Sequence, residues 1–215
     1  MFVPAQYREP DSSWMVDLIR RNPLALMVTD GGAQRGPFAT HLPVIEDPEA
    51  APAAVGAGLS GAVLLGHMNR QNPHWSALED GQVILLVFTG PHGYISPTVY
   101  KKTPAAPTWD FTAVHVHGTV RKIDSLEETL GVVKSTVRNF EAGLGTGWDM
   151  TQSLDYFDQL APGVGAFRVT VTGAESMFKL SQEQQPETRC LVRESFAGRE
   201  DGRHRETAEL IARLP

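Results

Sequence analysis

Short apolar segments follow one another along this chain without a regular alternation of strand and helix, and this feature restricts its fold most. The segments are the length of strands, and turn-forming residues separate many of them. They span residues 24–29, 38–45, 61–68, 82–88, 112–123 and 165–171. Such an order favours antiparallel pairing over a doubly wound parallel sheet. We therefore expect a mainly β member of the α+β class, built on a barrel whose first two strands form a hairpin.

Helices are expected around this barrel. Asp11–Ser13 offers N-cap oxygens before an apolar stripe, and Asn22-Pro23 stops that helix. A second helix is expected over 125–140, capped by Ser125, with a stripe formed by Leu126, Leu130, Val133 and Val137. Shorter helices are expected over 72–78, 153–160, 187–196 and 206–214. We expect a barrel domain over residues 1–185 and a helical extension over 186–215 packed on it.

Composition narrows the classes of protein. With 41% hydrophobic residues in 215, the chain can bury an ordinary core. A net charge of -6 repels phosphates, so nucleic-acid binding is not expected. The single cysteine, Cys190, excludes an intrachain disulfide and a thiolate zinc cluster. Neither a leader nor a membrane-spanning apolar run is recognised, and a cytoplasmic protein is expected.

His67 is the first candidate ligand residue. It ends an apolar segment and follows Gly66, which leaves room for a flat group to approach the backbone. Neutral imidazole is a good axial ligand for haem iron when its other nitrogen is oriented by a hydrogen bond. A histidine that caps the following helix or satisfies a buried carbonyl is the structural alternative. Spacing alone does not choose between them.

His115 and His117 are the second candidates. Strand alternation places both on one face and Val114 and Val116 on the other. The pair is suited to holding a metal or lining a pocket, but two polar residues on the solvated side of a half-buried strand are the commoner explanation.

Residues 94–111 form the richest segment, with aromatics, hydroxyls, cations and prolines in what we expect to be an irregular loop. Prolines reduce the entropy that a loop loses when it clasps a ligand. Lys101 and Lys102 are suited to a carboxylate or phosphate, unless they are merely solvated, and Trp109 is either a binding or a core residue. Further on, Ser181 is either an N-cap or a ligand group.

Taken in order, several short motifs resemble the PaiB-like FMN-binding proteins, a family described as negative transcriptional regulators with a split-barrel fold. The motifs are Met1-Phe2-Val3-Pro4, Asn22-Pro23-Leu24-Ala25, His41-Leu42-Pro43, Gly66-His67, Asn72-Pro73-His74-Trp75, Gly90-Pro91, Tyr94-Ile95-Ser96-Pro97, Pro107-Thr108-Trp109, Val114-His115 and Lys179-Leu180-Ser181-Gln182. The resemblance implies a split β-barrel of the FMN-binding, pyridoxamine-phosphate-oxidase-like type. It also implies a homodimer with a cofactor cleft between the subunits.

The chain departs from the common form of that family at Val99, Asp110-Phe111 and Glu183-Gln184, where the family has Trp, Asn-Tyr and Asn-Arg. The departures remove an aromatic and a cation and add two carboxylates, which disfavours a flavin phosphate. In this it resembles the haem-dependent piperazate synthases. The resemblance implies haem b and an intramolecular N–N bond formation that converts N5-hydroxy-L-ornithine to L-piperazic acid.

Residue roles follow from this resemblance and from charge matching. The resemblance places the axial iron ligand at His67, and further cofactor contacts are expected from Arg70, Tyr100 and Trp109. The substrate ammonium is matched to Asp110 or Glu183, and its carboxylate to Lys101, Lys102 or Arg70. The proton acceptor is left open among Tyr94, His115 and a water on Asp110. The alternatives to the haem enzyme are an FMN-binding oxidoreductase, a flavin sensor and a transcriptional regulator.

Overall fold

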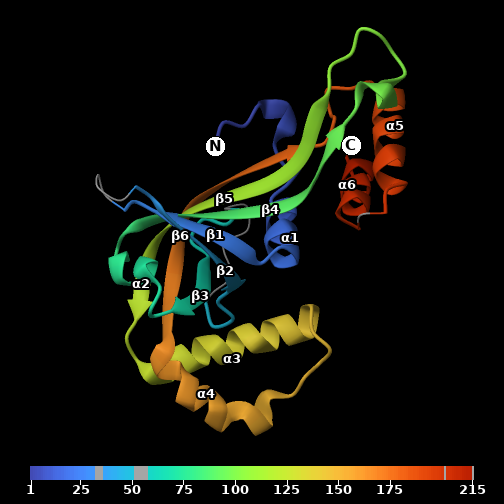
Figure 1. Ribbon diagram of the computed structural model, residues 1–215. Coiled ribbons are helices and arrows are strands. Elements are labelled where there is room, and N and C mark those ends of the chain that lie inside the picture. The colour runs from blue at the N-terminus through green and yellow to red at the C-terminus, as the bar shows by residue number, and fades with distance from the viewer. Residues whose placement is uncertain (32–35, 51–57, 201, 215) are drawn as a thin grey trace. The chain divides into compact units, whose positions relative to one another are not determined.

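The computed structural model describes residues 1–31, 36–50, 58–200 and 202–214. Six strands close into a barrel in the order β1-β2-β3-β6-β5-β4 (Figure 1). The strands are β1 (Leu24–Thr29), β2 (Phe38–Glu46), β3 (Val63–Asn69), β4 (Val83–Ile95), β5 (Thr108–Ile123) and β6 (Val164–Lys179). The pairs β1–β2, β1–β4, β2–β3 and β3–β6 are antiparallel. The expected mainly β barrel and its opening hairpin are confirmed, and residues 32–35, between the two strands of that hairpin, lie outside the described residues.

Helices and short 3-10 turns fill most of the connections. The α-helices are α1 (Ser13–Arg21), α2 (Pro73–Ala77), α3 (Leu126–Gly143), α4 (Leu154–Leu160), α5 (Pro186–Ala197) and α6 (Gly202–Ala212). The 3-10 turns are Ala5–Tyr7, Pro97–Tyr100, Met150–Ser153 and Ala161–Gly163. Among the described residues, no helix combines the length and the apolar character needed to cross a membrane.

The chain forms two compact units. The first comprises Met1–Asn22, Thr89–His115 and Glu175–Pro215, and contains α1 and the packed pair α5 and α6. The second comprises Pro23–Phe88 and Val116–Ala174, and contains β1, β2, β3 and α3. Strands β4, β5 and β6 each continue from one unit into the other. The expected domain boundary at residue 185 stays a prediction.

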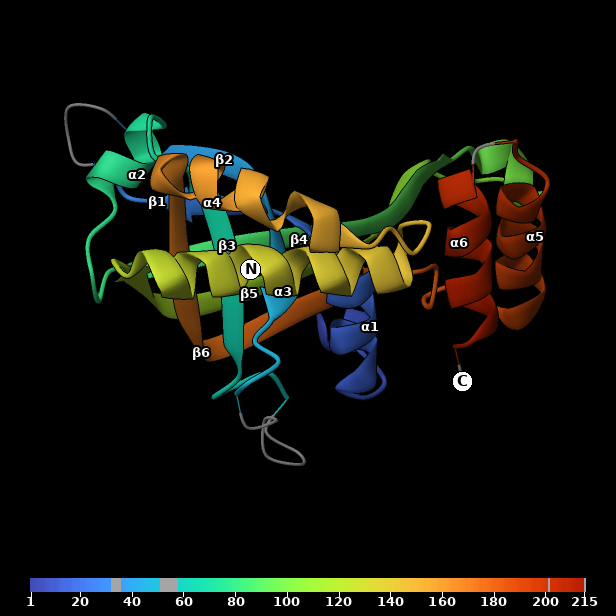
Figure 2. The same cartoon turned by 90° about the horizontal axis from the view of Figure 1, so that it is seen from below.

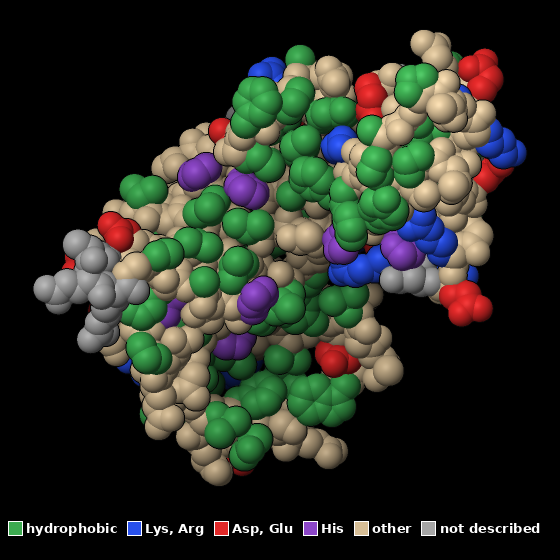
Figure 3. Space-filling view, turned by 45° about the horizontal axis from the view of Figure 1, so that its top comes forward, with side chains coloured by type: hydrophobic (Ala, Val, Ile, Leu, Met, Phe, Trp, Pro, Cys, Tyr) green, Lys and Arg blue, Asp and Glu red, His purple; other side chains and the backbone are tan. Residues whose placement is uncertain are grey.

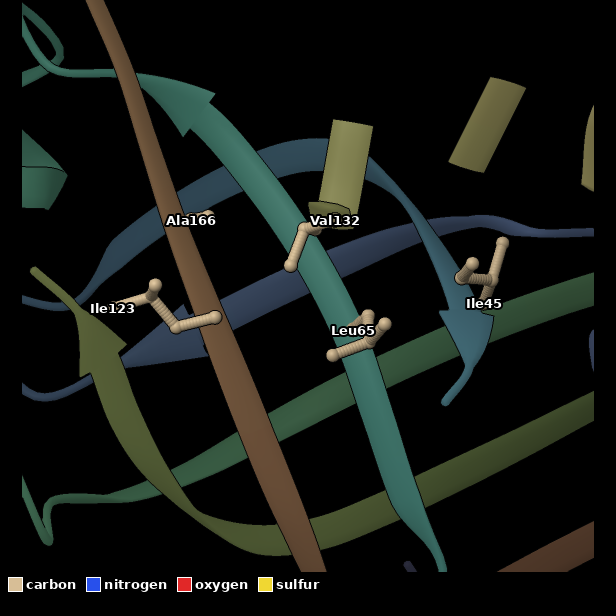
Figure 4. Close-up of a cluster of buried hydrophobic side chains, with 5 residues drawn as sticks. All are labelled: Ile45, Leu65, Ile123, Val132 and Ala166. Carbon is tan, nitrogen blue, oxygen red and sulfur yellow. The ribbon is translucent and has the colours of Figure 1, made fainter. Parts of the chain in front are cut away.

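Alternation along β3 separates the barrel interior from a second layer. Leu64 is fully buried, and a Cβ on Gly66 would lie 2.5 Å from the Phe167 ring, so these positions face the barrel interior. Leu65 points the other way. It packs in a second core with Val132 of α3 and with Ile45, Ile123 and Ala166 (Figure 4). Helix α3 covers β3 and β2 on this side, and Figure 2 shows it crossing the strands.

The expected apolar stripe of α3 is wrong. Its N-cap is Ser125, as expected, and the Ser125 hydroxyl accepts the N–H of Glu128. However, Leu126 is 49% exposed, and the buried positions of the helix are Thr129, Val132 and Thr136. Thr136 can be buried because its hydroxyl donates to the Val132 carbonyl at 2.8 Å.

The predicted irregular loop over 94–111 is shorter than expected. Strand β4 continues to Ile95 and β5 already begins at Thr108, so the connection covers only residues 96–107. Ser96 caps its 3-10 turn by accepting the N–H of Thr98. Tyr94, Trp109 and Asp110 therefore lie on strands, where backbone pairing holds them more rigidly than a loop would.

Candidate functional site

His67 lies on the outer side of β3, in the second unit. It shares this side with Leu65, and in the register with β6 it is opposite Ala166. Both of these neighbours belong to the core under α3. The histidine therefore lies at the border of an apolar layer, and its ring is only partly exposed. Figure 3 shows histidine side chains interspersed with hydrophobic ones on one face of the molecule.

The His67 ring has an unsatisfied nitrogen. Its Nδ1 is buried and has no hydrogen-bond partner among the described residues. Burial also lowers the pKa of the His67 imidazole below its usual value, so the ring is neutral at neutral pH. A neutral imidazole carries the lone pair that a metal needs. The conditions for an axial ligand are therefore met in part: the ring is neutral, but no described residue orients it through a hydrogen bond at Nδ1.

His74 provides the contrast, since it is the structural histidine of this unit. Its Nε2 and Nδ1 lie 2.8 Å from the hydroxyls of Thr29 and Thr40, and its ring stacks on Phe38. The N-cap of α2 is Asn72, whose side chain accepts the N–H of His74. The capping role considered for His67 is thus filled by a different residue.

Arg70 comes just after the end of β3 and is held in place. Its Nε donates to the Val164 carbonyl at 2.8 Å, and its guanidinium carbon lies 5.5 Å from the centre of the Trp75 ring. Lys122 lies 4.7 Å from the same ring centre. The predicted cofactor contact of Arg70 stays a prediction, and the structure supplies a fixed cation for it.

The first unit contains a second group of titratable side chains, which we call the Asp110 cluster. Its members come from the N-terminal 3-10 turn, the loop after β4, strand β5, and the end of β6 with the residues beyond it. They are Tyr7, Tyr100, Asp110, Lys179, Ser181 and Glu183.

Asp110 is the centre of this cluster. Its side chain is 0% exposed, its Oδ2 accepts the Ser181 hydroxyl at 2.8 Å, and its Oδ1 has no partner among the described residues. Burial raises the pKa of the Asp110 carboxyl to about 7; the hydrogen bond from Ser181 opposes this shift, and the negative charge of Glu183 adds to it. A carboxyl with this pKa exchanges a proton near neutral pH, as a general acid or base must.

Backbone conformation at Ser181 supports this arrangement. Ser181 is fully buried and has a φ of 61°, in the left-handed region that few residues other than glycine adopt. The side chain of Gln182 makes two hydrogen bonds to the backbone at the end of β6: its Oε1 accepts the Leu180 N–H at 2.7 Å, and its Nε2 donates to the Phe178 carbonyl. The turn after β6 is thereby fixed with its serine against the carboxyl.

Tyrosines and the second carboxylate line the outer part of the cluster. The Tyr7 hydroxyl donates to Glu183 Oε2 at 3.2 Å, and Glu183 is exposed. Tyr100 is only 5% exposed; burial, together with the charges of Asp110 and Glu183, raises the pKa of its phenol. Lys102 Nζ lies 5.6 Å from the centre of the Tyr100 ring and donates to Gln184 at 3.0 Å.

The structure thus brings Tyr100, Lys102, Asp110 and Glu183 together in the first unit. Tyr7 is the member of the Asp110 cluster that the sequence did not single out, whereas Ser181 was considered as either an N-cap or a ligand group and is fixed by the structure against Asp110. Tyr94 and Trp109 form a separate exposed aromatic group, in which the Trp109 Nε1 donates to His92 Nδ1 at 3.4 Å. Lys101 is exposed.

The two histidines of β5 lie on one face of the strand and the two valines on the other, as expected. Val114 and Val116 are fully buried, while His115 and His117 are partly exposed. In the described part of the chain, however, no group of three histidine, cysteine or carboxylate side chains is placed to hold a metal ion.

Comparisons with known proteins agree with this fold. The profile of a family described as "Putative FMN-binding domain" matches residues 1–173. An uncharacterised protein of Emericella nidulans is 29% identical over 216 residues, covering 85% of each chain. The protease synthase and sporulation protein PAI 2 of Bacillus subtilis is 25% identical over 213 residues, covering 98% of this chain and 96% of that protein.

Among solved structures, the FAD and haem binding protein from Mycobacterium smegmatis aligns with a TM-score of 0.54 at 14% identity, covering 86% of this chain and 78% of that one. At this identity the likeness is one of fold. The closed barrel with peripheral helices agrees with the split-barrel fold expected of FMN-binding proteins. Because the family profile covers most of its length, the chain belongs to this FMN-binding domain family, together with the PaiB-like proteins that its sequence resembles.

Proposed function

We propose that the protein binds haem b with His67 as axial ligand and closes the N–N bond of L-piperazic acid from N5-hydroxy-L-ornithine. The observation that carries the proposal is the ring of His67, neutral, half-buried and with one nitrogen unsatisfied. Because Nδ1 lies beneath the surface, an iron would have to meet the ring through its other nitrogen, Nε2. Haem binding by a relative of the same fold adds support.

The residues present suit this cofactor. His67 would hold the iron, and Arg70, a cation anchored on the Val164 carbonyl, would meet a propionate. When bound, the haem would supply a Lewis acid that weakens the N–O bond of the hydroxylamine.

The reaction balances without an external oxidant. The α-amine forms a bond to the hydroxylamine nitrogen, the N–O bond breaks, and the hydroxyl leaves as water with a proton from the α-amine. A protein group must accept that proton. The candidates, which are Tyr94, His115 and a water on Asp110, all belong to the first unit and stay open; burial raises the pKa of the Asp110 carboxyl to about 7, which suits the exchange of a proton. Holding the substrate folded would lower the barrier further, because the attack is intramolecular.

An absorption spectrum tests the cofactor. The purified protein, titrated with haemin, should develop a Soret band at a one-to-one ratio, and His67→Ala should abolish the band or shift it. The exposed His41 on β2 gives a matched control, so His41→Ala should behave as the wild type. The loaded protein should then convert N5-hydroxyornithine to a product lighter by one water, detected by mass spectrometry. Binding of haemin by His67→Ala with an unchanged spectrum would refute the assignment.

The alternative is an FMN-binding oxidoreductase, flavin sensor or regulator, which the family description favours. A flavin phosphate needs cations that are free to meet it. In the second unit Arg168 is paired with Asp47 at 3.3 Å and Glu128 at 2.9 Å, whereas Arg70, the cation matched above to a propionate, would serve a flavin phosphate equally. A protein that is isolated yellow with near-stoichiometric flavin, and that gives no Soret band with haemin, would establish the alternative over the haem enzyme. A salt-dependent gel shift with DNA would indicate the regulator.

We further propose that the protein is a homodimer, as the sequence resemblance implies. The outer side of the β1–β4 pair is apolar: Leu24 is 61% and Val83 67% exposed. Between them lie the partly exposed pairs Leu26–Val87 and Val28–Leu85. A second copy would cover this surface. Light scattering should give twice the chain mass, and Val83→Lys should give a monomer; a monomeric wild type would refute the dimer.

A further inference from the structure

Helix α4 and the loop that leads to it leave large apolar side chains uncovered. No residue from 142 to 160 is buried, although this stretch of the second unit contains leucines and aromatic residues. In Figure 1 the stretch forms the lower end of that unit, beyond α3. Four of its apolar side chains are about half exposed or more, and we call them the α4 surface. They are Leu144 at 65%, Trp148 at 48%, Tyr156 at 58% and Leu160 at 49%.

Helix α4 is apolar on more than one side. Leu154 and Phe157, three residues apart, are half-buried, whereas Tyr156 and Leu160, four residues apart, share another side that is exposed. The loop folds onto the helix, because the Trp148 and Phe157 ring centres lie 6.4 Å apart. A helix that is apolar on several sides is normally buried on all of them, and seven residues are too few for a helix to be stable by itself. The exposed side of α4 is therefore expected to meet a partner.

The charge around this surface indicates what kind of partner fits. Residues 124–160, which we call the acidic segment, contain seven acidic and two basic residues. Within it, Asp149, Asp155 and Asp158 lie in or next to the α4 surface, and residues 144–160 contain no lysine or arginine. Asp155 and Asp158 are exposed, and neither forms an ion pair within the described part of the chain. Their charges are thus available to a positively charged partner.

The same charge disfavours the other occupants. A second copy placed on the α4 surface by a two-fold axis would bring identical carboxylates together, and like charges across an interface are costly. Nucleic acids and anionic lipids carry the same sign of charge and are repelled as well. A basic protein segment avoids this cost. Its apolar side chains would cover Trp148 and Tyr156, which are residue types enriched in the energetically important centres of interfaces.

We propose that the α4 surface docks a basic, amphipathic segment of another protein. The partner's apolar side chains lie on Trp148, Tyr156 and Leu160, and its lysines or arginines meet the carboxylates of Asp155 and Asp158. None of these residues takes part in the haem site or in the dimer surface proposed above, so the inference stands apart from both.

A labelled synthetic peptide tests the surface by fluorescence anisotropy with the full chain. The probe has leucine at helical spacing and lysine at its other positions; it should bind, less tightly as salt is added, whereas the same peptide with glutamate for lysine should not bind. Tyr156→Ala should weaken binding at least about tenfold. The double variant Asp155→Asn, Asp158→Asn should weaken it about three- to tenfold. Two controls should bind as the wild type: Phe2→Ala, an exposed apolar residue of the first unit, and Glu79→Gln, an exposed carboxylate outside the acidic segment.

Several outcomes would overturn the proposal. They are no binding of the lysine peptide, equal binding of the two peptides, and equal affinity of wild type and Tyr156→Ala. A lower mass of Tyr156→Ala in light scattering would show instead that a second copy covers the surface. Sedimentation with phosphatidylserine vesicles that Tyr156→Ala abolishes would assign the surface to a membrane. Circular dichroism confirms that each variant is folded, and haemin titration of the same variants should match the wild type, so this proposal and the haem site fail independently.

Discussion

Replacing Asp110 by asparagine should change how the stability of the protein depends on pH. The carboxyl has a pKa of about 7 in the folded protein against a reference value of 3.8, so the folded state binds its proton more tightly than the unfolded chain. The protonated form therefore favours folding below about pH 4, and this contribution is lost as the pH rises to about 7. About three pKa units correspond to roughly 4 kcal/mol, and the side chain is 0% exposed, so solvent screens little of it.

The introduced asparagine cannot ionise, but it keeps an acceptor for the Ser181 hydroxyl. The variant should therefore gain stability relative to the wild type as the pH rises from about 4 to above 7, by up to roughly 4 kcal/mol. Urea unfolding at several pH values measures this difference. The buried imidazoles of His67 and His74 oppose it, because burial lowers their pKa and favours the folded state at higher pH, but they are common to both proteins and cancel. If the free energy of unfolding of the two proteins changed with pH in the same way, the reasoning would be refuted.

The remaining predictions concern packing. Gly165→Ala should destabilise the fold by about 1–3 kcal/mol, because the added Cβ would lie 2.5 Å from the Trp75 ring. Gly131 lies within helix α3, and a Cβ added there meets nothing within 4 Å, so Gly131→Ala should stabilise the fold by up to about 1 kcal/mol. Thermal unfolding of both variants checks these two predictions, and an equal change of the unfolding temperature in the two variants would contradict them. Leu65→Ala should cost about 2–5 kcal/mol in urea unfolding because it empties the layer under Val132; a loss below about 1 kcal/mol would show that α3 closes the space.

The strands were predictable from sequence because their interior positions are apolar and separated by turns. Their lengths were not: β4 runs on through Gly90-Pro91, residues that usually end a strand, and β5 begins at the polar Thr108. The stripe of α3 was wrong because hydrophobicity alone passes over Thr129 and Thr136, and a threonine hydroxyl can be buried when a helix carbonyl accepts it, as at Thr136.

The candidate site also contains residues that could be predicted from sequence and contacts that could not. His67 could be singled out from its local sequence, since a histidine beside a glycine at the end of an apolar segment carries its own signal. The partners of Asp110 could not, because Ser181 is 71 residues away and the Tyr7–Glu183 contact spans 176. Nor does sequence reveal that one oxygen of Asp110 is left without a donor among the described residues, which depends on the packing of separate segments.

The passage of β4, β5 and β6 through both units has a practical consequence for anyone dissecting the protein. Because the first unit is assembled from three stretches of chain and the second from two, neither corresponds to a contiguous gene fragment. Truncation would cut strands in the middle and expose their edges, so such pieces are expected to aggregate. Function is better separated by point substitutions, such as His67→Ala and Asp110→Asn, than by expressing the units alone.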